Sequence, residues 1–276
     1  MAPVLALAGA GDMATATAVR MATTHTAVVG DPVADRRDAC VAAVRAAGGT
    51  AHAVPLDITG PDEVAAFARA CRDSGRVTGL LVAAGLSPAQ AEPGRIVEVD
   101  LLGVLRVLDT FVEVLVEGGA AVVVASIAGH LLGAVDPAVE AAWTHLPVED
   151  LRHHPDLTAD ALAGNPALAY MRAKRAIHLR VRAAAGPWGA RGLRINTVSP
   201  GVIDTAMGRA ELSGPDGAGM ELLVAASPVP RLGTADEVAA ATTFLLGPGA
   251  GFITGTDLTV DGGSVATALL PPAPAT

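Results

Sequence analysis

The feature that most constrains the fold is an alternation that runs along almost the whole chain. Short runs of apolar residues are followed by longer, alanine-rich stretches. The apolar runs lack regular polar alternation, which is typical of strands buried on both faces of a parallel sheet. Strands and helices alternating at this spacing predict a doubly wound α/β fold with about seven parallel strands. The expected strands are residues 4–8, 26–30, 51–56, 79–84, 120–125, 193–198 and 257–260.

The alanine-rich stretches predict helices on both faces of this sheet, within one Rossmann-type domain that covers residues 1–268. Residues 130–164 interrupt the rhythm, since no strand appears there and Trp143, Leu146, Leu157 and Leu162 lie among polar residues. We expect a helical insertion that folds over the substrate as a lid; a disordered surface excursion is the alternative. The Pro-rich tail, residues 269–276, is expected to be extended. The expected helices are residues 12–22, 33–47, 61–73, 95–117, 165–187 and 235–246.

Composition excludes several classes of protein. Hydrophobic residues make up 51% of the 276 positions, enough for a large core, and the formal net charge of −9 argues against nucleic-acid binding. Cys40 and Cys71 form neither a metal-binding nor a redox motif. The first residues lack the basic region of a signal peptide, and no apolar run is long enough to cross a membrane. We expect a soluble, cytoplasmic protein.

A glycine turn follows the first apolar run directly and opens the first expected helix. It reads Gly9-Ala10-Gly11-Asp12-Met13-Ala14, a G-x-G-x-x-A pattern. Gly9 permits the tight turn, and Gly11 lets the backbone approach a pyrophosphate, which the helix N-terminus attracts. An ordinary glycine turn is the alternative, but the position between strand and helix favours nucleotide binding.

Asp31 ends the second expected strand, roughly twenty residues after the glycine turn, where an acidic group can bind the adenosine ribose. A carboxylate there also repels a 2′-phosphate, so NAD is favoured and NADP is the lesser candidate. Asp31-Pro32 is alternatively a good helix N-cap followed by proline at the first helical position. Arg36 and Arg37 follow closely and weaken the preference for NAD.

Other candidate residues stand where the remaining strands end, at the edge where an open α/β sheet binds its ligand. Asp57-Ile58 closes the third strand, and Ala83-Ala84-Gly85 closes the fourth. Ser126 follows the fifth strand, where its hydroxyl can point at a substrate oxygen. The segment 196–205, NTVSPGVIDT, ends the sixth strand sharply on the same side. Taken singly, each of these is also consistent with an ordinary turn.

The helix expected over residues 165–187 carries the best candidate for proton transfer. Asn165 suits its N-cap, Pro166 its first position, and Gly186-Pro187 is a stop signal. Tyr170 and Lys174 are four residues apart and therefore project from one face. A nearby ammonium favours the phenolate and lowers the pKa of a tyrosine. A solvated helix face is the alternative. His130, His145, His153, His154 and His178 lack metal-ligand spacing, and we expect loop or surface positions for them.

Together these motifs, in this order, resemble the short-chain dehydrogenase/reductase family over nearly the whole chain. Further matching stretches are RLGTADEV at 231–238 and TGTDLTVDGG at 254–263. Within the family, the insertion and the stretches around residues 84–90 and 188–197 are similar to bacterial 3α-hydroxysteroid dehydrogenase/carbonyl reductases. The resemblance implies hydride transfer between NAD(P) and a carbonyl or alcohol.

The resemblance also implies roles for single residues. Tyr170 is the acid/base, Lys174 lowers its pKa and holds the nicotinamide ribose, and Ser126 binds the substrate oxygen. Asp57 and Ile58 would flank the adenine, Ile203 would contact the carboxamide end, and Thr205 would contact the carboxamide or the diphosphate. The implied catalytic residues are Ser126, Tyr170, Lys174 and Asp100, with no metal ligand; the implied cofactor-binding residues are Gly9, Gly11, Asp12, Met13, Asp31, Asp57, Ile58, Ala83, Ala84, Gly85, Tyr170, Lys174, Pro200, Gly201, Ile203 and Thr205.

The sequence departs from the family pattern at several points. The glycine turn is shorter than the usual T-G-x-x-x-G-x-G, and residues 82–85 read VAAG where N-N-A-G is usual. The asparagine of the family's catalytic tetrad falls on Asp100, which puts the proton relay in doubt. Ser126 and Tyr170 are further apart than usual because the insertion lies between them.

We therefore expect an enzyme that interconverts a secondary alcohol and a ketone with NAD(H). Apolar residues of the insertion, with Met207 and Met220 from the other side, predict a medium-sized, largely apolar substrate that is alicyclic or steroid-like. Apart from mobile histidines and Arg209, little in this set could pair with a charged substrate. The family resemblance implies a homodimer or homotetramer. A non-catalytic NAD(H) sensor or assembly subunit is the alternative.

Overall fold

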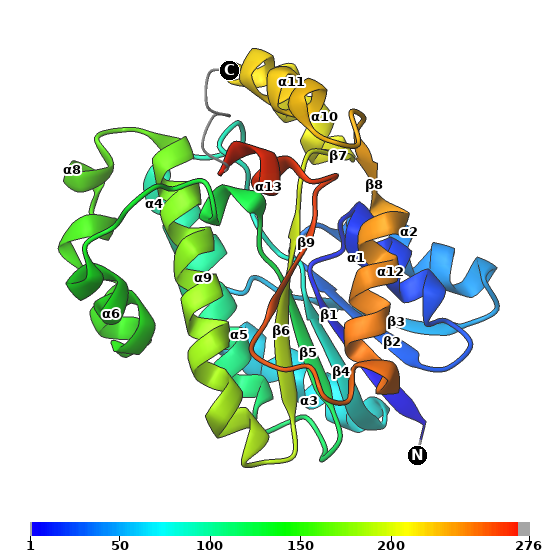
Figure 1. Ribbon diagram of the computed structural model, residues 1–276. Helices are drawn as coiled ribbons and strands as arrows, with labels where there is room; N and C mark the ends of the chain where they lie inside the picture. Colours follow the sequence, from blue (N-terminus) through cyan, green and yellow to red (C-terminus); the bar gives the residue numbers. More distant parts are fainter. Residues whose placement is uncertain (1, 270–276) are drawn as a thin grey trace.

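A computed structural model describes residues 2–269, so most of the expected tail lies outside the described residues. Seven parallel strands form one sheet in the order β3-β2-β1-β4-β5-β6-β9, which confirms the expected fold class (Figure 1). The strands are β1 Pro3–Ala8, β2 Thr26–Asp31, β3 Thr50–Pro55, β4 Arg76–Val82, β5 Ala120–Val124, β6 Arg194–Pro200 and β9 Asp257–Val260; the short strands β7 Ile203–Asp204 and β8 Gly233–Thr234 pair separately.

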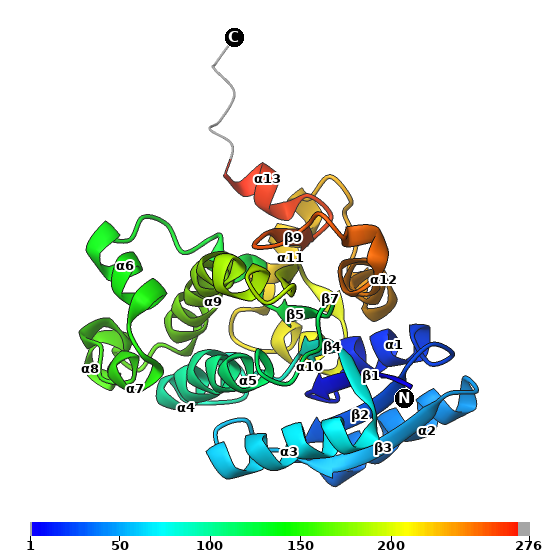
Figure 2. The same ribbon diagram turned by 90° about the horizontal axis from the view of Figure 1, so that it is seen from below.

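Helices cover both faces of the sheet, and each face has its own core. In β1, Val4 and Ala6 face the core that is shared with α3, α5 and α9, whereas Leu5 and Leu7 face the core shared with α1, α2 and α12 (Figure 2). Burial on both sides explains why the strands read as unbroken apolar runs. The helices are α1 Asp12–Arg20, α2 Ala34–Ala46, α3 Pro61–Ser74, α4 Pro93–Val97, α5 Val104–Phe111, α9 Pro166–Gly189 and α12 Ala235–Leu246.

Two expected helices differ from the structure. The helix expected over residues 95–117 is divided: a π-helical segment, Glu98–Gly103, separates α4 from α5, and α5 ends at Phe111. The stop expected at Gly186-Pro187 is wrong, because α9 continues to Gly189. Pro187 lies only in the last turn, and the buried Trp188 anchors that turn in the core. Asn165 caps α9 as expected, accepting the Leu168 amide at 3.0 Å.

The insertion is folded, so the alternative of a disordered excursion is wrong. Its helices lie beside α9 in Figure 1, where the buried Trp143, Leu151 and Leu162 join the core of that face. Arg180 of α9 donates to the Trp143 carbonyl, and Arg175 pairs with Glu140 at 2.7 Å. Its elements are α6 Pro137–His145, α7 Val148–Leu151, the 3₁₀ turn Pro155–Leu157 and α8 Ala159–Leu162.

Most of the remaining short elements surround the carboxyl ends of the strands, whereas the 3₁₀ turn Pro248–Ala250 follows the end of α12 near Arg194, the first residue of β6. Within residues 2–269, no helix is long and apolar enough to span a membrane. These elements are the 3₁₀ turn Ile127–Gly129, α10 Ala206–Leu212, α11 Gly217–Ala226, the 3₁₀ turn Pro248–Ala250 and α13 Ser264–Ala268.

Candidate active site

The strand order reverses direction between β1 and β4, and a crevice opens there at the carboxyl ends of the strands. A cavity of about 1060 Å³ occupies its central part. Of the expected site residues, twelve line this cavity: Met13, Ala83, Ala84, Gly85, Asp100, Ser126, Tyr170, Lys174, Pro200, Gly201, Ile203 and Thr205. Gly9, Gly11, Asp12, Asp31, Asp57 and Ile58 lie outside it, at or just beyond the ends of β1, β2 and β3.

The glycine turn has the geometry that the sequence predicts. Gly9 has φ +106°, and a Cβ there would lie 2.5 Å from the Ala84 amide nitrogen, so only glycine fits between β1 and β4. Gly11 is the N-cap of α1, and a Cβ there would meet no atom within 4 Å. The first amides of a helix have no partner within the helix and attract anions. The turn therefore fits a pyrophosphate group.

Asp31 is buried and holds the glycine turn in place. Its carboxylate accepts the amides of Ala10 at 3.0 Å and Val33 at 2.9 Å. The alternative role as N-cap of α2 is wrong, because that helix begins at Ala34 with Val33 as its N-cap. Arg37 Nη1 donates to the Asp31 carbonyl at 2.5 Å, so Arg37 lies close to the expected ribose site, whereas Arg36 is exposed.

Three other expected cofactor residues are engaged with the protein itself. Asp57 accepts from Thr59 and pairs with Arg95 at 3.1 Å. Ile58 is buried, with its side chain against Gly103, and its carbonyl accepts from Arg106 at 3.2 Å, so its amide is the group left to meet an adenine. Asp12 accepts the Ala206 amide at 2.8 Å and thereby joins α1 to α10.

The end of β6 supplies the opposite wall of the cavity. A Cβ on Gly201 would lie 2.8 Å from Asp261 Cα, so this chain segment passes close to the one after β9. The Thr205 hydroxyl caps α10 by accepting the Gly208 amide at 3.0 Å. Its oxygen is therefore already committed to a structural hydrogen bond.

Ser126, Tyr170 and Lys174 meet at the centre of the cavity wall. Ser126 is the N-cap of the 3₁₀ turn after β5, and its Oγ accepts the Ala128 amide at 3.1 Å. Lys174 Nζ lies 5.2 Å from the centroid of the Tyr170 ring and 3.4 Å from the Val124 carbonyl oxygen. The spacing of four residues on α9 thus does place phenol and ammonium on one face, as the sequence predicts.

Burial raises the pKa of the Tyr170 phenol above its ordinary value. The Lys174 charge and a hydrogen bond with Ser126 act against this rise, and the Asp100 charge adds to it. The expected effect of Lys174 is therefore correct in direction, but a net lowering of the phenol pKa is not what the structure shows.

Asp100 lies in the π-helical segment and is completely buried. Its Oδ1 accepts the Leu86 amide at 2.8 Å, and its Oδ2 lies 3.1 Å from Lys174 Nζ. A Cβ on Gly85 would come within 2.9 Å of that Oδ2, so glycine is needed at this approach. Burial raises the pKa of Asp100. Burial alone would lower the pKa of Lys174, but the Asp100 carboxylate and the Tyr170 phenol outweigh it, so the pKa of Lys174 is raised.

The cavity is mostly apolar, and α10 and α11 line one side of it. Met207, Met220 and Leu223 line it, as does Leu131. We expected Trp143 and Leu146 to cover the substrate, but Trp143 lies in the core beside α9, Leu146 packs against that core, and neither lines the cavity.

Two acidic residues, which the sequence reading missed, also line the cavity. Glu211 and Asp216 follow the sixth strand in the same stretch as the two methionines. Burial raises the pKa of Glu211 above its ordinary value, and the Lys174 charge only partly opposes this rise. Arg209, in contrast, pairs with Asp204 at 2.5 Å and does not line the cavity. The expectation that little could pair with a charged substrate is therefore wrong.

One histidine also departs from expectation. His178 is buried, and with His130 it faces Asp257, so the loop or surface position expected for His178 is wrong. The three residues come from different elements, so no local spacing in the sequence could have revealed them.

Comparisons with known proteins assign the family. Residues 3–142 match the model described as short chain dehydrogenase, and residues 157–265 match one described as enoyl-(acyl carrier protein) reductase. The chain belongs to the short-chain dehydrogenase/reductase family. It is therefore an oxidoreductase of alcohol- or ketone-type substrates, and its fold binds a nicotinamide cofactor. The alternative of a non-catalytic sensor finds no support.

Relatives with known names cover most of the chain. The 3-alpha-hydroxysteroid dehydrogenase/carbonyl reductase of Comamonas testosteroni is 33% identical over 67% of this chain and 71% of its own length. The cis-4-hydroxycyclohexanecarboxylate dehydrogenase of Sinomonas cyclohexanicum is 30% identical over 93% of this chain and 94% of its own.

A solved structure, that of levodione reductase, shares the fold with a TM-score of 0.74 at 24% identity, covering 96% of this chain and 98% of that one.

Proposed function

We propose that this chain interconverts a secondary alcohol and a ketone with NAD(H), and that its substrate is medium-sized, largely apolar, and alicyclic or steroid-like. The observation that carries the proposal is that Ser126, Tyr170 and Lys174 line one mostly apolar cavity. A carbonyl group placed between Ser126 and Tyr170 would find both hydroxyls, while its apolar body would lie against Met207 and Met220.

Each residue has a defined task in this reaction. The bound nicotinamide supplies or accepts the hydride. The Tyr170 phenol donates its proton to the carbonyl oxygen during reduction, and as phenolate it takes the hydroxyl proton during oxidation. Ser126 hydrogen-bonds the same oxygen and holds it beside Tyr170. Lys174, which is kept protonated beside Asp100, stabilises the phenolate and offers its ammonium to the ribose hydroxyls.

The preference for NAD rests on Asp31. Both carboxylate oxygens accept one amide each, and each oxygen retains a lone pair for a ribose hydroxyl. The fixed negative charge would lie beside the 2′-phosphate of NADP and repel it. Arg37 lies near enough to oppose this effect, but its Nη1 is held by the Asp31 carbonyl.

The composition of the cavity supports the proposed substrate class. A flexible, apolar surface suits an irregular ring system. The relatives from Comamonas and Sinomonas are named for a hydroxysteroid and for a hydroxycyclohexanecarboxylate; both names describe ring alcohols, and the second one is an anion. Glu211 and Asp216 add negative charge, so neutral or cationic substrates are favoured over carboxylates.

We further propose a homodimer or homotetramer as the working assembly, without nucleic-acid or membrane partners. Family members often associate through the helices that correspond to α4, α5 and α9. In this chain the insertion packs on α9, so an assembly would have to use the remaining surface or the insertion itself. Sedimentation at micromolar concentration tests this, and a monomer would contradict it.

The direct test of the proposed function is turnover of purified protein with NADH and NADPH. The panel should contain cyclohexanone, decalone and 3-ketosteroids, with linear aldehydes and keto acids as contrasts. We expect the ring ketones with NADH to give the highest kcat/KM. A failure of every ring ketone, with turnover of small keto acids, would contradict the proposed substrate class.

A further inference from the structure

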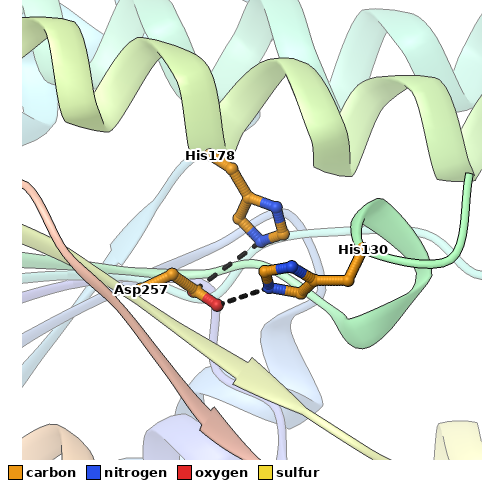
Figure 3. A group of neighbouring side chains, drawn as sticks. All are labelled: His130, His178 and Asp257. Atoms are coloured by element: carbon orange, nitrogen blue, oxygen red, sulfur yellow. Dashed lines mark hydrogen bonds and ion pairs between the residues drawn. The ribbon is translucent and has the colours of Figure 1, made fainter. Parts of the chain in front are cut away.

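A second cluster of chemically capable side chains lies outside the cavity, between α9 and the sheet (Figure 3). His130 follows the 3₁₀ turn that begins at Ser126, and His178 lies one helical turn after Lys174 on α9. Asp257 is the first residue of β9. The cluster therefore joins the two elements that carry the catalytic residues to the edge strand of the sheet.

The potential ligand atoms converge closely. His130 Nε2 lies 2.7 Å from Asp257 Oδ2, and His178 Nε2 lies 3.7 Å from Asp257 Oδ1. One such atom from each residue lies within 4.8 Å of the other two. Tetrahedral zinc with bonds of about 2.0–2.2 Å separates its ligands by roughly 3.3–3.6 Å. Side-chain rotations that move these ligand atoms by up to about one ångström would bring them to that spacing.

Asp257 lacks a permanent positive partner. Its side chain is only 11% exposed, and within residues 2–269 its ion pairs are with the two histidines alone. The nearby cations have carboxylates of their own, since Lys174 pairs with Asp100 and Arg175 with Glu140. A largely buried carboxylate without a fixed cation favours the binding of one.

The carboxylate is already oriented as in a metal site. Its Oδ1 accepts the hydroxyls of Thr197 at 2.5 Å and Ser199 at 2.8 Å. Both donors belong to β6, the neighbouring strand, on which Thr197 is paired directly with Asp257. Such outer hydrogen bonds fix the direction of a ligating carboxylate and leave its other oxygen, here Oδ2, for the ion.

We propose that His130, His178 and Asp257 bind a zinc ion, separate from the catalytic cavity, that ties the Ser126 turn to α9 and β9. Two imidazole nitrogens and one carboxylate oxygen are ligands that zinc accepts, with water as the fourth. The side chain of His130 is 24% exposed, which gives the ion and its water a way in. The ring protons of His130 and His178 must both move from Nε2 to Nδ1, because zinc binds the unprotonated nitrogen. Nε2 of His130 donates to Asp257, and Nε2 of His178 donates to Ser199, whose own hydroxyl proton goes to Asp257. The alternative is a hydrogen-bonded network in which His178 contacts Ser199 at 2.8 Å without any ion.

The test uses the full chain, freed of metal with a chelator and titrated with Zn²⁺ by calorimetry and with Co²⁺ by visible absorption. We expect one Zn²⁺ per chain at micromolar or lower Kd, a rise in Tm with Zn²⁺, and the absorption of tetrahedral Co²⁺. His130→Asn and Asp257→Asn should weaken binding at least about tenfold and abolish the rise in Tm. His145→Asn is the matched control, since His145 is exposed on α6, and should bind as the wild type does.

The measurements are made on metal-free folded protein, so circular dichroism of each variant before titration shows whether its fold is retained. If His130→Asn and Asp257→Asn are folded and bind Zn²⁺ as tightly as wild type, the site is elsewhere and the proposal fails. It fails equally if wild type binds no Zn²⁺ at 100 µM free metal, roughly a hundred times the expected Kd; the cluster is then a hydrogen-bonded network only. Neither result bears on the proposed dehydrogenase activity.

Discussion

Lys174 Nζ lies 3.1 Å from Asp100 Oδ2, and both side chains are buried beside Tyr170. The pair depends on the π-helical segment, which places Asp100 where its other oxygen accepts the Leu86 amide. Where the family has a neutral asparagine, this chain therefore has a second buried ionisable group close to the Tyr170 phenol. Its charge raises the phenol pKa and partly cancels the effect of the lysine.

Tyr170→Phe removes the transferable proton while it keeps the aromatic ring in place. We expect turnover to fall by about 10²–10⁴-fold, since no other group supplies general acid–base catalysis at that oxygen. Cofactor affinity, measured by fluorescence titration of the same protein, should change little. Activity within a few-fold of wild type would show that Tyr170 is not the acid/base.

Asp100→Asn restores the family residue and keeps an oxygen that can accept the Leu86 amide. Oxidation of an alcohol needs the phenolate, so its rate rises with pH toward the raised pKa of Tyr170; ketone reduction needs the phenol and declines over the same range. Removing the carboxylate lowers the phenol pKa, so both pH profiles should shift to lower pH. Glu113→Gln, an exposed position that pairs with Arg191, is the control and should leave the profiles unchanged.

Asp31→Asn tests cofactor choice. It keeps one carbonyl oxygen for the backbone amides and removes the negative charge. We expect kcat/KM with NADPH to rise about tenfold, because relief of a repulsion of about 1.4 kcal/mol corresponds to that factor. Arg37→Ala tests the alternative that Arg37 binds the 2′-phosphate of NADP. If the wild type prefers NADP and Arg37→Ala loses that preference, Arg37 binds the 2′-phosphate, and Asp31 serves mainly to hold the glycine turn.

Glu211→Gln tests whether the acidic residues that line the cavity, Glu211 and Asp216, select against anionic substrates. The comparison is cyclohexanone with 4-oxocyclohexanecarboxylate, measured as the ratio of their kcat/KM values. The variant should reduce this ratio several-fold. Lowering the pH should have the same effect on the wild type, because the raised pKa of Glu211 lets it take up a proton at higher pH than usual. Glu221→Gln on α11, which does not line the cavity, should leave the ratio as it is.

The features that the sequence predicted are those in which neighbouring residues suffice. Gly9 lies between a strand and a helix, and Tyr170 and Lys174 are one turn apart, so local geometry places them without knowledge of the rest. The parallel sheet then brings all the strand ends to one edge, which is why so many expected residues line one cavity.

The features that the sequence missed depend on contacts between distant segments. Nothing local shows that the helix around Asp100 widens into a π-helical turn, or that Glu211 lines the cavity whereas Arg209 does not. His178 and Asp257 meet because β9 returns to the sheet beside β6. Trp143 signalled a buried contact but not which surface it would bury; the structure shows that this surface is α9.

The insertion supplies a final prediction, with Trp143→Ala and Leu131→Ala as a matched pair. Trp143 is 1% exposed in the core beside α9, whereas Leu131 lines the cavity and is only partly buried. Trp143→Ala should lower the free energy of unfolding by about 3–5 kcal/mol and leave KM for ring ketones nearly unchanged. Leu131→Ala should raise KM for ring ketones and lower the free energy of unfolding by less than Trp143→Ala does. Urea denaturation and steady-state kinetics on both proteins decide the matter. A sharp rise of KM in Trp143→Ala, under conditions where the variant is fully folded, would mean that the insertion closes over the substrate after all.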